Sequence, residues 1–234
     1  MSLGGLEGEY LLVRAGVAEL ATEVTGLRAG GWDGLNVTMP LKVAAARAAD
    51  RLTRDAELSG SVNTLARRDG EVVGASTDAG TMAALIAEPR FTRIGTILVL
   101  GAGGAAAAMM VGAGPDREVY VSSRRLGEAR SLADRHGGEA VPWGTVVPGA
   151  LLVNATPIGM RGEELPSPVV DAAAAVVDLP YADGVTPLVA RAGMLGLEWV
   201  GGHEFLVRQA IASFVWWTGI DLDFEDVSAA LRKA

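Results

Sequence analysis

A glycine-rich turn between an apolar, strand-like segment and an alanine-rich segment is the feature that most restricts how this chain can fold. Residues 94–115 contain no charged residue, and a run of this length could form a membrane helix. Gly101, Gly103 and Gly104 interrupt the run near its middle, where glycines weaken a helix. The half before them is rich in β-branched residues, and the half after them in alanine and methionine. The pattern therefore predicts a strand, a tight turn and a helix rather than a membrane span.

The sequence after this turn repeats the same strand–helix rhythm. Four strand-like segments are separated by helix- or loop-like stretches, and we expect the strands at residues 96–100, 118–122, 151–154 and 175–179. Alternation at this spacing is typical of a parallel, doubly wound sheet. Before the turn, shorter strands are expected at residues 9–14, 34–38, 61–66 and 71–75, and helices at residues 17–24, 41–49 and 79–87. The Asp-Gly pair at positions 69 and 70 predicts a hairpin.

These elements predict an α/β protein of two domains. Residues 81–203 are expected to form a Rossmann-like nucleotide-binding domain with a doubly wound parallel sheet. Residues 1–80, together with residues 204–234, are expected to form a smaller α/β domain for the substrate. The helical segment 204–217 is apolar at helical spacing and is expected to pack back onto the smaller domain. An active site is expected in the cleft between the two domains.

Composition removes several classes of function. The net charge of −8 argues against nucleic acid as a partner, because that binding relies on clustered Lys and Arg. The chain has no cysteine, which excludes disulfides and thiolate metal sites and suits the cytoplasm. The sequence from residues 1–5 onward has no basic region followed by a long apolar segment, so no signal peptide is expected. His136 and His203 stand apart from each other and from the acidic clusters, and no metal site is predicted.

The glycine turn carries a recognisable ligand signature. Residues 98–106 read L-V-L-G-A-G-G-A-A, the G-x-G-x-x-A form of the dinucleotide-binding fingerprint. The first glycine permits the tight turn, the second lets the backbone approach a pyrophosphate, and Ala106 keeps helix and strand close. The pyrophosphate would lie at the helix N-terminus, where free N–H groups favour negative charge. The predicted cofactor-binding residues in this turn are Gly101, Ala102, Gly103, Gly104 and Ala105.

A basic turn follows about twenty residues further on, where the next predicted strand ends. Enzymes that prefer NAD place Asp or Glu there, to hold the ribose 2′-hydroxyl. This chain has Ser123, Arg124 and Arg125 instead, and guanidinium groups suit a 2′-phosphate. By themselves two arginines would be interpreted as a solvated basic turn. Because they follow the fingerprint at the required spacing, they predict NADP as the cofactor.

Further motifs resemble, in order along the chain, those of the shikimate dehydrogenase family. Segment 34–42 resembles N-V-T-x-P-x-K, and segments 60–65 and 74–79 resemble G-A-V-N-T and G-x-N-T-D-G. Residues 154–160 resemble the family's loop after a cofactor-domain strand. Residues 178–188 resemble the pattern Y-x-P-x-x-T-P-L, and residues 202–210 resemble G-x-x-M-L-x-x-Q-A. The resemblance extends from about Leu6 to Leu231.

The resemblance implies a reaction and roles for individual residues. The reaction is the reversible, NADPH-dependent reduction of 3-dehydroshikimate to shikimate, a step of aromatic amino acid biosynthesis. Lys42 and Asp78 would form the acid/base pair, with the ammonium near the reacting oxygen and the carboxylate orienting it. The implied substrate-binding residues are Thr38, Asn63, Tyr181 and Gln209, and the further cofactor-binding residues are Thr156 and Gly202. Taken without the resemblance, Lys42 would be a surface lysine and Asp78 a helix N-cap.

The sequence also departs from the family pattern. Members have an initial strand and a serine pair, in a pattern like H-S-x-S-P, that is expected to hold the substrate carboxylate. This sequence begins at what resembles the end of the following helix. Two explanations stay open: a start site downstream of the true one, or a form that has lost part of its substrate site. Smaller departures are Ser76, Ala79, Phe205 and Glu128, and Glu128 weakens the NADP argument slightly.

Alternatives within and outside the enzyme class remain. A quinate or aminoshikimate dehydrogenase would share most of these motifs, although the acidic residue expected for NAD preference is absent. A catalytically impaired NADP-binding protein of the same fold would keep the fingerprint and Arg124, but it would have no need of both Lys42 and Asp78. The implied partner is a small-molecule substrate, without nucleic acid or membrane, and the protein is expected to be a monomer or a homodimer.

Overall fold

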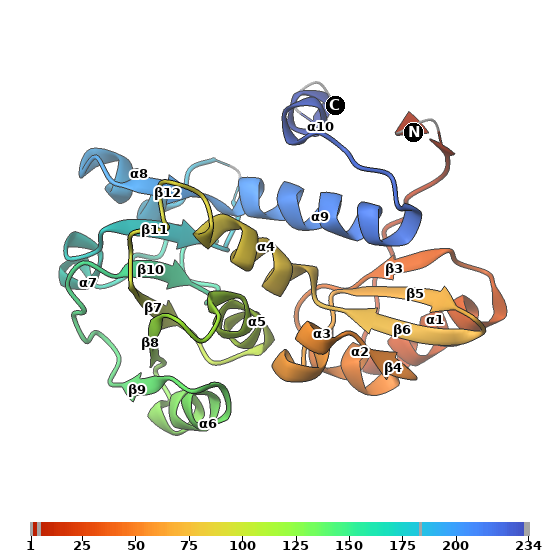
Figure 1. Ribbon diagram of the computed structural model, residues 1–234, viewed down its shortest axis with the longest axis horizontal. Helices are drawn as coiled ribbons and strands as arrows, with labels where there is room; N and C mark the ends of the chain where they lie inside the picture. Colours follow the sequence, from red (N-terminus) through yellow and green to blue (C-terminus); the bar gives the residue numbers. More distant parts are fainter. Residues whose placement is uncertain (1, 4–5, 183, 232–234) are drawn as a thin grey trace. The chain divides into compact units, whose positions relative to one another are not determined.

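The computed structural model describes residues 2–3, 6–182 and 184–231 of the chain (Figure 1). The chain forms two compact units. One consists of Met1–Thr77 with Val207–Ala234, and is called the discontinuous unit below. The other, Asp78–Leu206, is called the continuous unit. The predicted α/β class, with a parallel doubly wound sheet in one domain and a smaller α/β domain, is confirmed.

A six-stranded parallel sheet forms the centre of the continuous unit, in the order β12-β11-β10-β7-β8-β9. Counted from β7, this is the 3-2-1-4-5-6 order of dinucleotide-binding folds. The strands are β7 (Thr96–Leu100), β8 (Glu118–Ser122), β9 (Glu139–Val141), β10 (Leu151–Asn154), β11 (Ala175–Asp178) and β12 (Glu198–Val200). The helices are α4 (Thr77–Ile86), α5 (Gly104–Ala113), α6 (Leu126–His136), α7 (Ser167–Asp171), α8 (Pro187–Met194) and α9 (Gly202–Thr218), the last of which continues into the discontinuous unit.

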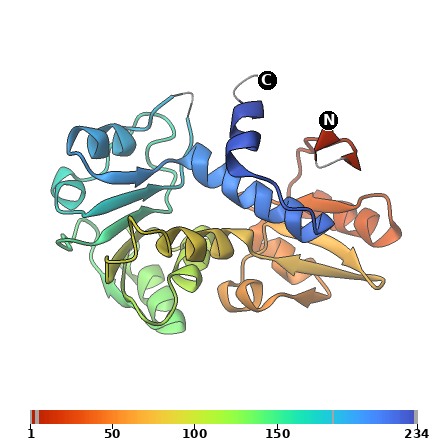
Figure 2. The ribbon, with the colours of Figure 1, turned by 45° about the horizontal axis from the view of Figure 1, so that its top comes forward.

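Helices cover both faces of this sheet (Figures 1 and 2), which explains why its central strands are apolar at nearly every position. Along β7, Ile97 and Val99 belong to the core cluster that includes α4, α5 and α6. Leu98 and Leu100, which point the opposite way, belong to the cluster that includes α7 and α8. A sheet buried on both faces requires near-continuous apolar strands. The uncharged run of residues 94–115 is therefore a buried strand and a buried helix, as predicted.

The discontinuous unit contains a four-stranded sheet in the order β3-β5-β6-β4 and a separate two-stranded hairpin, β1 with β2. Its strands are β1 (Ser2–Leu3), β2 (Leu6–Glu7), β3 (Gly34–Asn36), β4 (Arg51–Leu52), β5 (Thr64–Arg68) and β6 (Glu71–Ala75). Its helices are α1 (Val17–Ala29), α2 (Lys42–Ala48), α3 (Arg54–Ser59) and α10 (Phe224–Leu231), together with α9 from Val207. Asp69 and Gly70 have φ values of 53° and 85°, the left-handed pair that a type I′ hairpin needs.

The prediction of a strand over residues 9–14 was wrong. Residues 8–16 form no regular element, and the nearest strand is β2. Tyr10, Leu11 and Leu12 are 70%, 58% and 91% exposed. Among the described residues no strand pairs with this segment, so its run of four apolar residues has neither a ladder partner nor a core to pack against. A strand pattern needs both before it becomes a strand.

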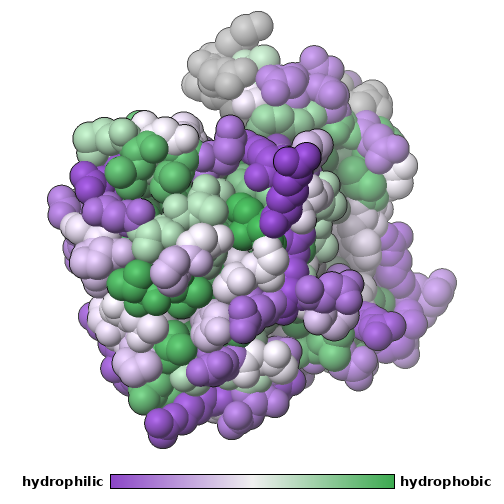
Figure 3. Space-filling view, turned by 60° about the vertical axis from the view of Figure 1, so that its left-hand side comes forward, coloured by the Kyte–Doolittle hydropathy of each residue, from purple (hydrophilic) through white to green (hydrophobic). Residues whose placement is uncertain are grey.

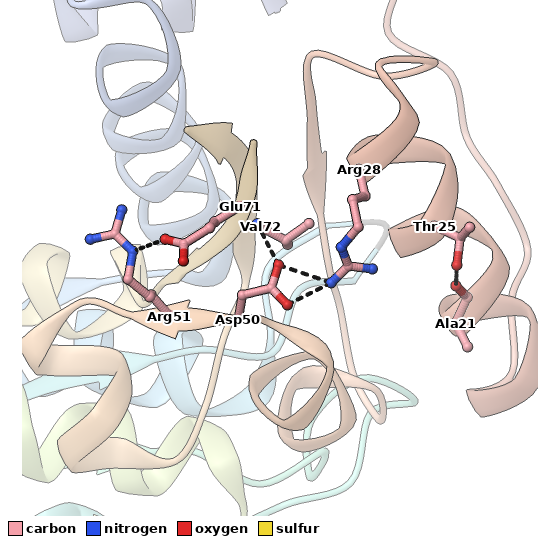
Figure 4. A network of polar contacts seen from close by, with 7 residues as sticks. All are labelled: Ala21, Thr25, Arg28, Asp50, Arg51, Glu71 and Val72. Carbon is pink, nitrogen blue, oxygen red and sulfur yellow. Dashed lines mark hydrogen bonds and ion pairs between the residues drawn. The ribbon is translucent and has the colours of Figure 1, made fainter. Parts of the chain in front are cut away.

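A shared carboxylate joins three elements of the discontinuous unit (Figure 4). Asp50, which follows α2, accepts hydrogen bonds from the Arg28 guanidinium at 2.8 and 2.9 Å and from the Val72 N–H at 2.8 Å. The backbone bond from Val72, followed by the bond from Arg28, holds the pKa of this carboxyl below its usual value. Next to it, Arg51 and Glu71 form an ion pair across β4 and β6. The end of α1 is thereby attached to the sheet edge.

Polar and apolar side chains are interspersed on the face shown in Figure 3, where the apolar groups are interrupted by polar ones. Exposed apolar residues of the continuous unit include Val185, Met194 and Trp199. Single exposed apolar residues are usual on protein surfaces. None of the helices in the described part of the chain is long and apolar enough to cross a membrane.

The close contact of α4 with α5 generates a stability prediction. A Cβ added at Gly112 would lie 2.5 Å from the Ala79 carbonyl oxygen and 2.7 Å from the Met82 Cβ. We expect Gly112→Ala to lower the free energy of unfolding by about 1–3 kcal/mol, because the helices must separate. Gly80, also in α4, has no atom within 4 Å of its added Cβ, so Gly80→Ala should raise the free energy by about 0.5–1 kcal/mol. Urea unfolding of both variants measures this, and equal effects would contradict it.

Candidate functional site: a dinucleotide turn and a polar cluster

The glycine turn after β7 is fixed by the strands on both sides of it. Gly101 has a φ of +118°, and its N–H donates to the Ser122 carbonyl at 2.8 Å. A Cβ added at Gly101 would lie 2.8 Å from the carbonyl oxygen of Ala155, in the loop after β10. Glycine is required here both by the backbone angle and by the neighbouring backbone. The turn thus lies at the switch point of the sheet, where ligands bind in this class of fold.

The next glycine leaves backbone open to a ligand. Gly103 is the N-cap of α5, with an extended backbone and no side chain to cap the helix. A Cβ added at Gly103 would meet no atom within 4 Å, so the space above this residue is not filled by the described part of the chain. The first N–H groups of a helix have no partner within the helix. Gly103, Gly104 and Ala105 therefore offer donors that suit a pyrophosphate, while the fully buried Ala106 packs the helix onto the sheet.

The two arginines after β8 differ in their surroundings. Ser123 Oγ accepts a hydrogen bond from the Arg125 N–H at 3.3 Å. The Arg125 guanidinium forms an ion pair with Glu128 at 2.8 Å, although its side chain is 79% exposed. Arg124 is also exposed. Of the two, Arg124 is therefore better placed to pair with a phosphate, since Arg125 would have to leave Glu128.

The loops that leave β10 and β11 are organised around buried polar groups. Asn154 and Asp178 are both 0% exposed, and the Asn154 amide donates to Asp178 Oδ1 at 2.8 Å. Thr156, a predicted cofactor residue, is held by Asn154 Oδ1, which accepts its N–H at 3.1 Å and its hydroxyl at 2.7 Å. Thr186 donates to the other oxygen of Asp178 and caps α8. Burial raises the pKa of Asp178 to about 6, although the hydrogen bonds from Thr186 and Asn154 act to lower it.

Two further predicted residues lie just beyond this network. A Cβ at Gly202, the first residue of α9, would lie 2.1 Å from the Pro180 carbonyl oxygen, so only glycine fits there. Tyr181 is 45% exposed, and its ring centroid lies 6.1 Å from that of His203. Phe205, which stands where the family has Met, is buried in the core of the unit.

A polar cluster of the discontinuous unit brings together Asn63 and Gln209, which are 146 positions apart in sequence. The Asn63 amide donates to Gln209 Oε1 at 2.8 Å and to Thr77 Oγ1 at 2.8 Å, and its oxygen accepts the Thr77 N–H at 2.8 Å. Ser213, one turn further along α9, contacts Thr77 Oγ1 at 3.2 Å and Thr64 Oγ1 at 2.7 Å. Sequence reasoning singled out Asn63 and Gln209 but missed Thr77 and Ser213 as their partners. The i, i+4 spacing of Gln209 and Ser213 on one helix was the available signal.

The remaining predicted residues lie at element ends. Lys42 is the first residue of α2 and half-buried, and its carbonyl accepts the Val62 N–H at 3.0 Å. Thr38 is exposed, and its carbonyl accepts the Leu41 N–H at 2.9 Å. Asp78 is the second residue of α4 and only 4% exposed. The described residues contain no group of three or more His, Asp or Glu that could hold a metal ion.

Fold and site together define the class of the continuous unit. A parallel sheet in the 3-2-1-4-5-6 order, with an open glycine turn at its switch point, is a Rossmann-type dinucleotide-binding unit. Comparison with known proteins identifies the family. Residues 1–65 match the model of the shikimate dehydrogenase substrate binding domain, and residues 202–232 match that of the shikimate 5′-dehydrogenase C-terminal domain.

Whole-chain comparisons agree with these matches. The chain is 36% identical to the shikimate dehydrogenase (NADP⁺) of Gluconobacter oxydans, over 98% of this chain and 88% of that protein. It is 38% identical to the enzyme of the same name from Rubrobacter xylanophilus, over 98% of this chain and 86% of that protein. The crystal structure of shikimate 5-dehydrogenase from Thermus thermophilus, in complex with NADP(H) and shikimate, matches with a TM-score of 0.85 and 32% identity, over 98% and 89% of the two chains. The chain belongs to the shikimate dehydrogenase family.

The buried carboxyl of Asp178 generates a prediction for stability against pH. Its pKa is about 6 in the folded chain, above the ordinary value of 3.8, so the folded state binds the proton more tightly than the unfolded state. Stability from this group is therefore greatest at low pH and is lost as the pH rises through the folded pKa. We expect the loss to reach about 3 kcal/mol between about pH 4 and about pH 7.

The measurement is urea unfolding across this pH range for the natural chain and for Asp178→Asn, which cannot ionise. The difference between the two free-energy curves should fall with rising pH, with most of the change below about pH 6. Parallel curves would show that folding does not raise the pKa of Asp178.

Proposed function

We propose that this protein catalyses the reversible oxidation of shikimate to 3-dehydroshikimate with NADP⁺. The observation that carries the proposal is the presence, in one chain of this family, of an open dinucleotide turn at Gly103 and of a polar cluster around Asn63. Relatives that carry the name shikimate dehydrogenase (NADP⁺) align over nearly the whole chain. We further propose that the enzyme works in the cytoplasm, as a monomer or a homodimer.

The cofactor-binding residues of the proposal are those of the glycine turn and the basic turn, with Thr156 and Gly202. NADP⁺, when bound, accepts the hydride that leaves the alcohol carbon. The N–H groups of the α5 N-terminus would hold its pyrophosphate. Arg124 would pair with its 2′-phosphate, and Ser123 would supply a hydroxyl beside it. Arg125 would join them only at the expense of its ion pair with Glu128.

Lys42 and Asp78 carry the proton in the proposed mechanism. Oxidation of a secondary alcohol releases a hydride from carbon and a proton from oxygen, and a positioned base must take that proton. The Lys42 amine accepts the proton from the reacting hydroxyl and returns it to the carbonyl oxygen in the reverse direction. Asp78 orients the ammonium and stabilises its charge. Because Lys42 begins a helix, its backbone position is set by α2 and by its bond to Val62.

The polar cluster supplies two of the proposed substrate contacts, Asn63 and Gln209, and Thr38 and Tyr181 are proposed beside them. Asn63, Gln209, Thr38 and Tyr181 carry donors and acceptors of the kind that bind sugar-like hydroxyls. Both amide hydrogens of Asn63 are directed at Gln209 and Thr77. A substrate hydroxyl would therefore replace the hydrogen bond between Asn63 and Gln209, and each of the two amides would then bond to the ligand. Such an exchange adds little net hydrogen-bond energy, because a bond within the protein and the bonds of the hydroxyl to water are given up for the new ones.

Loss of Lys42 tests the reaction directly. We expect Lys42→Ala to lower kcat for shikimate-dependent reduction of NADP⁺ by about 10²–10⁴, the usual contribution of a positioned acid/base. The dissociation constant of NADP⁺, measured by calorimetry, should not change. Arg47→Ala is the matched control, since it removes an exposed cation from the same helix and should leave kcat unchanged.

The outcomes separate the alternatives. Turnover that persists in Lys42→Ala would remove the assigned role of the lysine. Binding of NADP⁺ without turnover in the natural chain would indicate a nucleotide-binding protein of this fold that does not catalyse the reaction. Faster turnover of quinate or aminoshikimate than of shikimate would reassign the substrate.

The contrast between the two arginines tests the cofactor. We expect Arg124→Ala to weaken NADP⁺ binding about 10- to 100-fold, because a charge-assisted contact to the 2′-phosphate is lost. Binding of NAD⁺, which lacks this phosphate, should change little. Arg125→Ala should have a smaller effect, since that side chain already pairs with Glu128. Equal weakening of NADP⁺ and NAD⁺ by Arg124→Ala would assign Arg124 to stability rather than to the 2′-phosphate.

A further inference from the structure

Asp178 is a fully buried carboxyl that the proposed mechanism does not use. It ends β11, and its register partner in the parallel sheet is Asn154, the last residue of β10. Burying a carboxylate is unfavourable unless both oxygens are satisfied. Here Oδ1 accepts from the Asn154 amide at 2.8 Å, and Oδ2 accepts from the Thr186 hydroxyl. A carboxyl kept in the core at this position, with both oxygens bonded, requires a reason beyond packing.

The carboxylate fixes which way the Asn154 amide points. As an acceptor only, it binds the NH₂ of Asn154 and excludes the amide oxygen from its side. The oxygen must then face Thr156, whose N–H and hydroxyl it accepts at 3.1 and 2.7 Å. The same NH₂ donates to the Ile158 carbonyl at 2.9 Å. If the amide were reversed, its NH₂ would face the Thr156 N–H and its oxygen would face the Ile158 carbonyl. The conformation of residues 155–158 therefore depends on Asp178.

This loop and the one after β11 touch backbone that forms the cofactor site. The Ala155 carbonyl lies so near Gly101 that an added Cβ would be 2.8 Å from its oxygen. After β11, the Pro180 carbonyl oxygen would be 2.1 Å from a Cβ at Gly202. Neither contact leaves room for adjustment, since both are backbone against backbone. One buried carboxyl thus holds the two loops that follow β10 and β11.

The topology indicates which part of a dinucleotide these loops serve. In a doubly wound sheet, each half of the strands takes one mononucleotide, and the ligand crosses the switch point. The half with β7, β8 and β9 carries the glycine turn and Arg124, so it takes the adenosine side. The half with β10, β11 and β12 is left for the nicotinamide side. Building on the proposed function, we propose that Asp178 is a positioning residue for the nicotinamide half of the cofactor site, and that it acts through the amide of Asn154.

The test compares the whole cofactor with its adenosine part. Asp178→Asn keeps the shape of the side chain but introduces a donor, which permits the reversed amide of Asn154. We expect the dissociation constant of NADP⁺ to rise about tenfold, while that of adenosine 2′,5′-bisphosphate stays within about twofold. A merely structural role would move both ligands together or neither, and either result would overturn the proposal.

Two variants make the test specific. Thr186→Val removes the other hydrogen bond to the carboxyl and the cap of α8 but keeps the Asn154 contact, so it should lower stability without the selective loss of NADP⁺ affinity. The exchanged pair Asn154→Asp with Asp178→Asn restores an amide–carboxylate bond and leaves an acceptor facing Thr156. Because a carboxylate at position 154 has no N–H for the Ile158 carbonyl, the pair should recover part of the NADP⁺ affinity lost in Asp178→Asn, and failure to recover any would overturn the role given to Asn154.

Failure of this inference is distinguishable from failure of the proposed function. A natural chain that binds NADP⁺ but does not oxidise shikimate would contradict the proposed reaction, while the binding contrast would still decide the role of Asp178. A natural chain that binds no NADP⁺ would overturn both. A natural chain that turns over shikimate, with an Asp178→Asn variant that binds NADP⁺ equally well, would overturn this inference alone.

Discussion

The contact between the glycine turn and the loop after β10 is the constraint on which the rest of the continuous unit depends. A parallel sheet brings the carboxyl ends of its strands to one edge, and the reversal of strand order places β7 directly beside β10. Two chain segments must then leave adjacent strands in different directions without colliding. Gly101 solves this, because it has no Cβ where the Ala155 carbonyl lies. Two residues further on, Gly103 also lacks a side chain, and this leaves backbone N–H groups open at the start of α5.

Most of the continuous unit could be predicted from sequence, for a physical reason. Strands buried on both faces are mostly apolar, and the helices between them give a regular spacing, so β7, β8 and β10 were predicted with the bounds that the structure has. Glycines that are required by a close backbone contact, such as Gly101, could also be recognised from the sequence. The segment 9–14 shows the limit of this reasoning. Its short apolar run is typical of a strand, yet a strand also needs neighbouring strands, and a local pattern carries no information about them.

The polar cluster of the discontinuous unit could be predicted only in part. The family motifs named Asn63 and Gln209, but nothing local to either residue indicates that they bond to each other or to Thr77. The hydrogen-bond network at Asp178 could not be predicted from the sequence, for a related reason. An aspartate after an apolar strand is usually read as the start of a loop, and only the register of two parallel strands shows that it faces Asn154. In both places the chemistry is made by long-range pairing, which periodicity does not encode.

The discontinuous unit is assembled from two distant parts of the chain, and this has a consequence for synthesis. Trp217, on α9, donates its indole N–H to the Leu65 carbonyl of β5 at 3.0 Å, across 152 positions, and its ring covers Gly34 of β3. A ribosome adds about 5–20 residues per second. The sheet around Leu65 therefore waits for about 8 to 30 seconds before its covering helix exists. The continuous unit, which ends at Leu206, is synthesised in full before Trp217, so the sheet around Leu65 is covered only after all residues of the other unit exist.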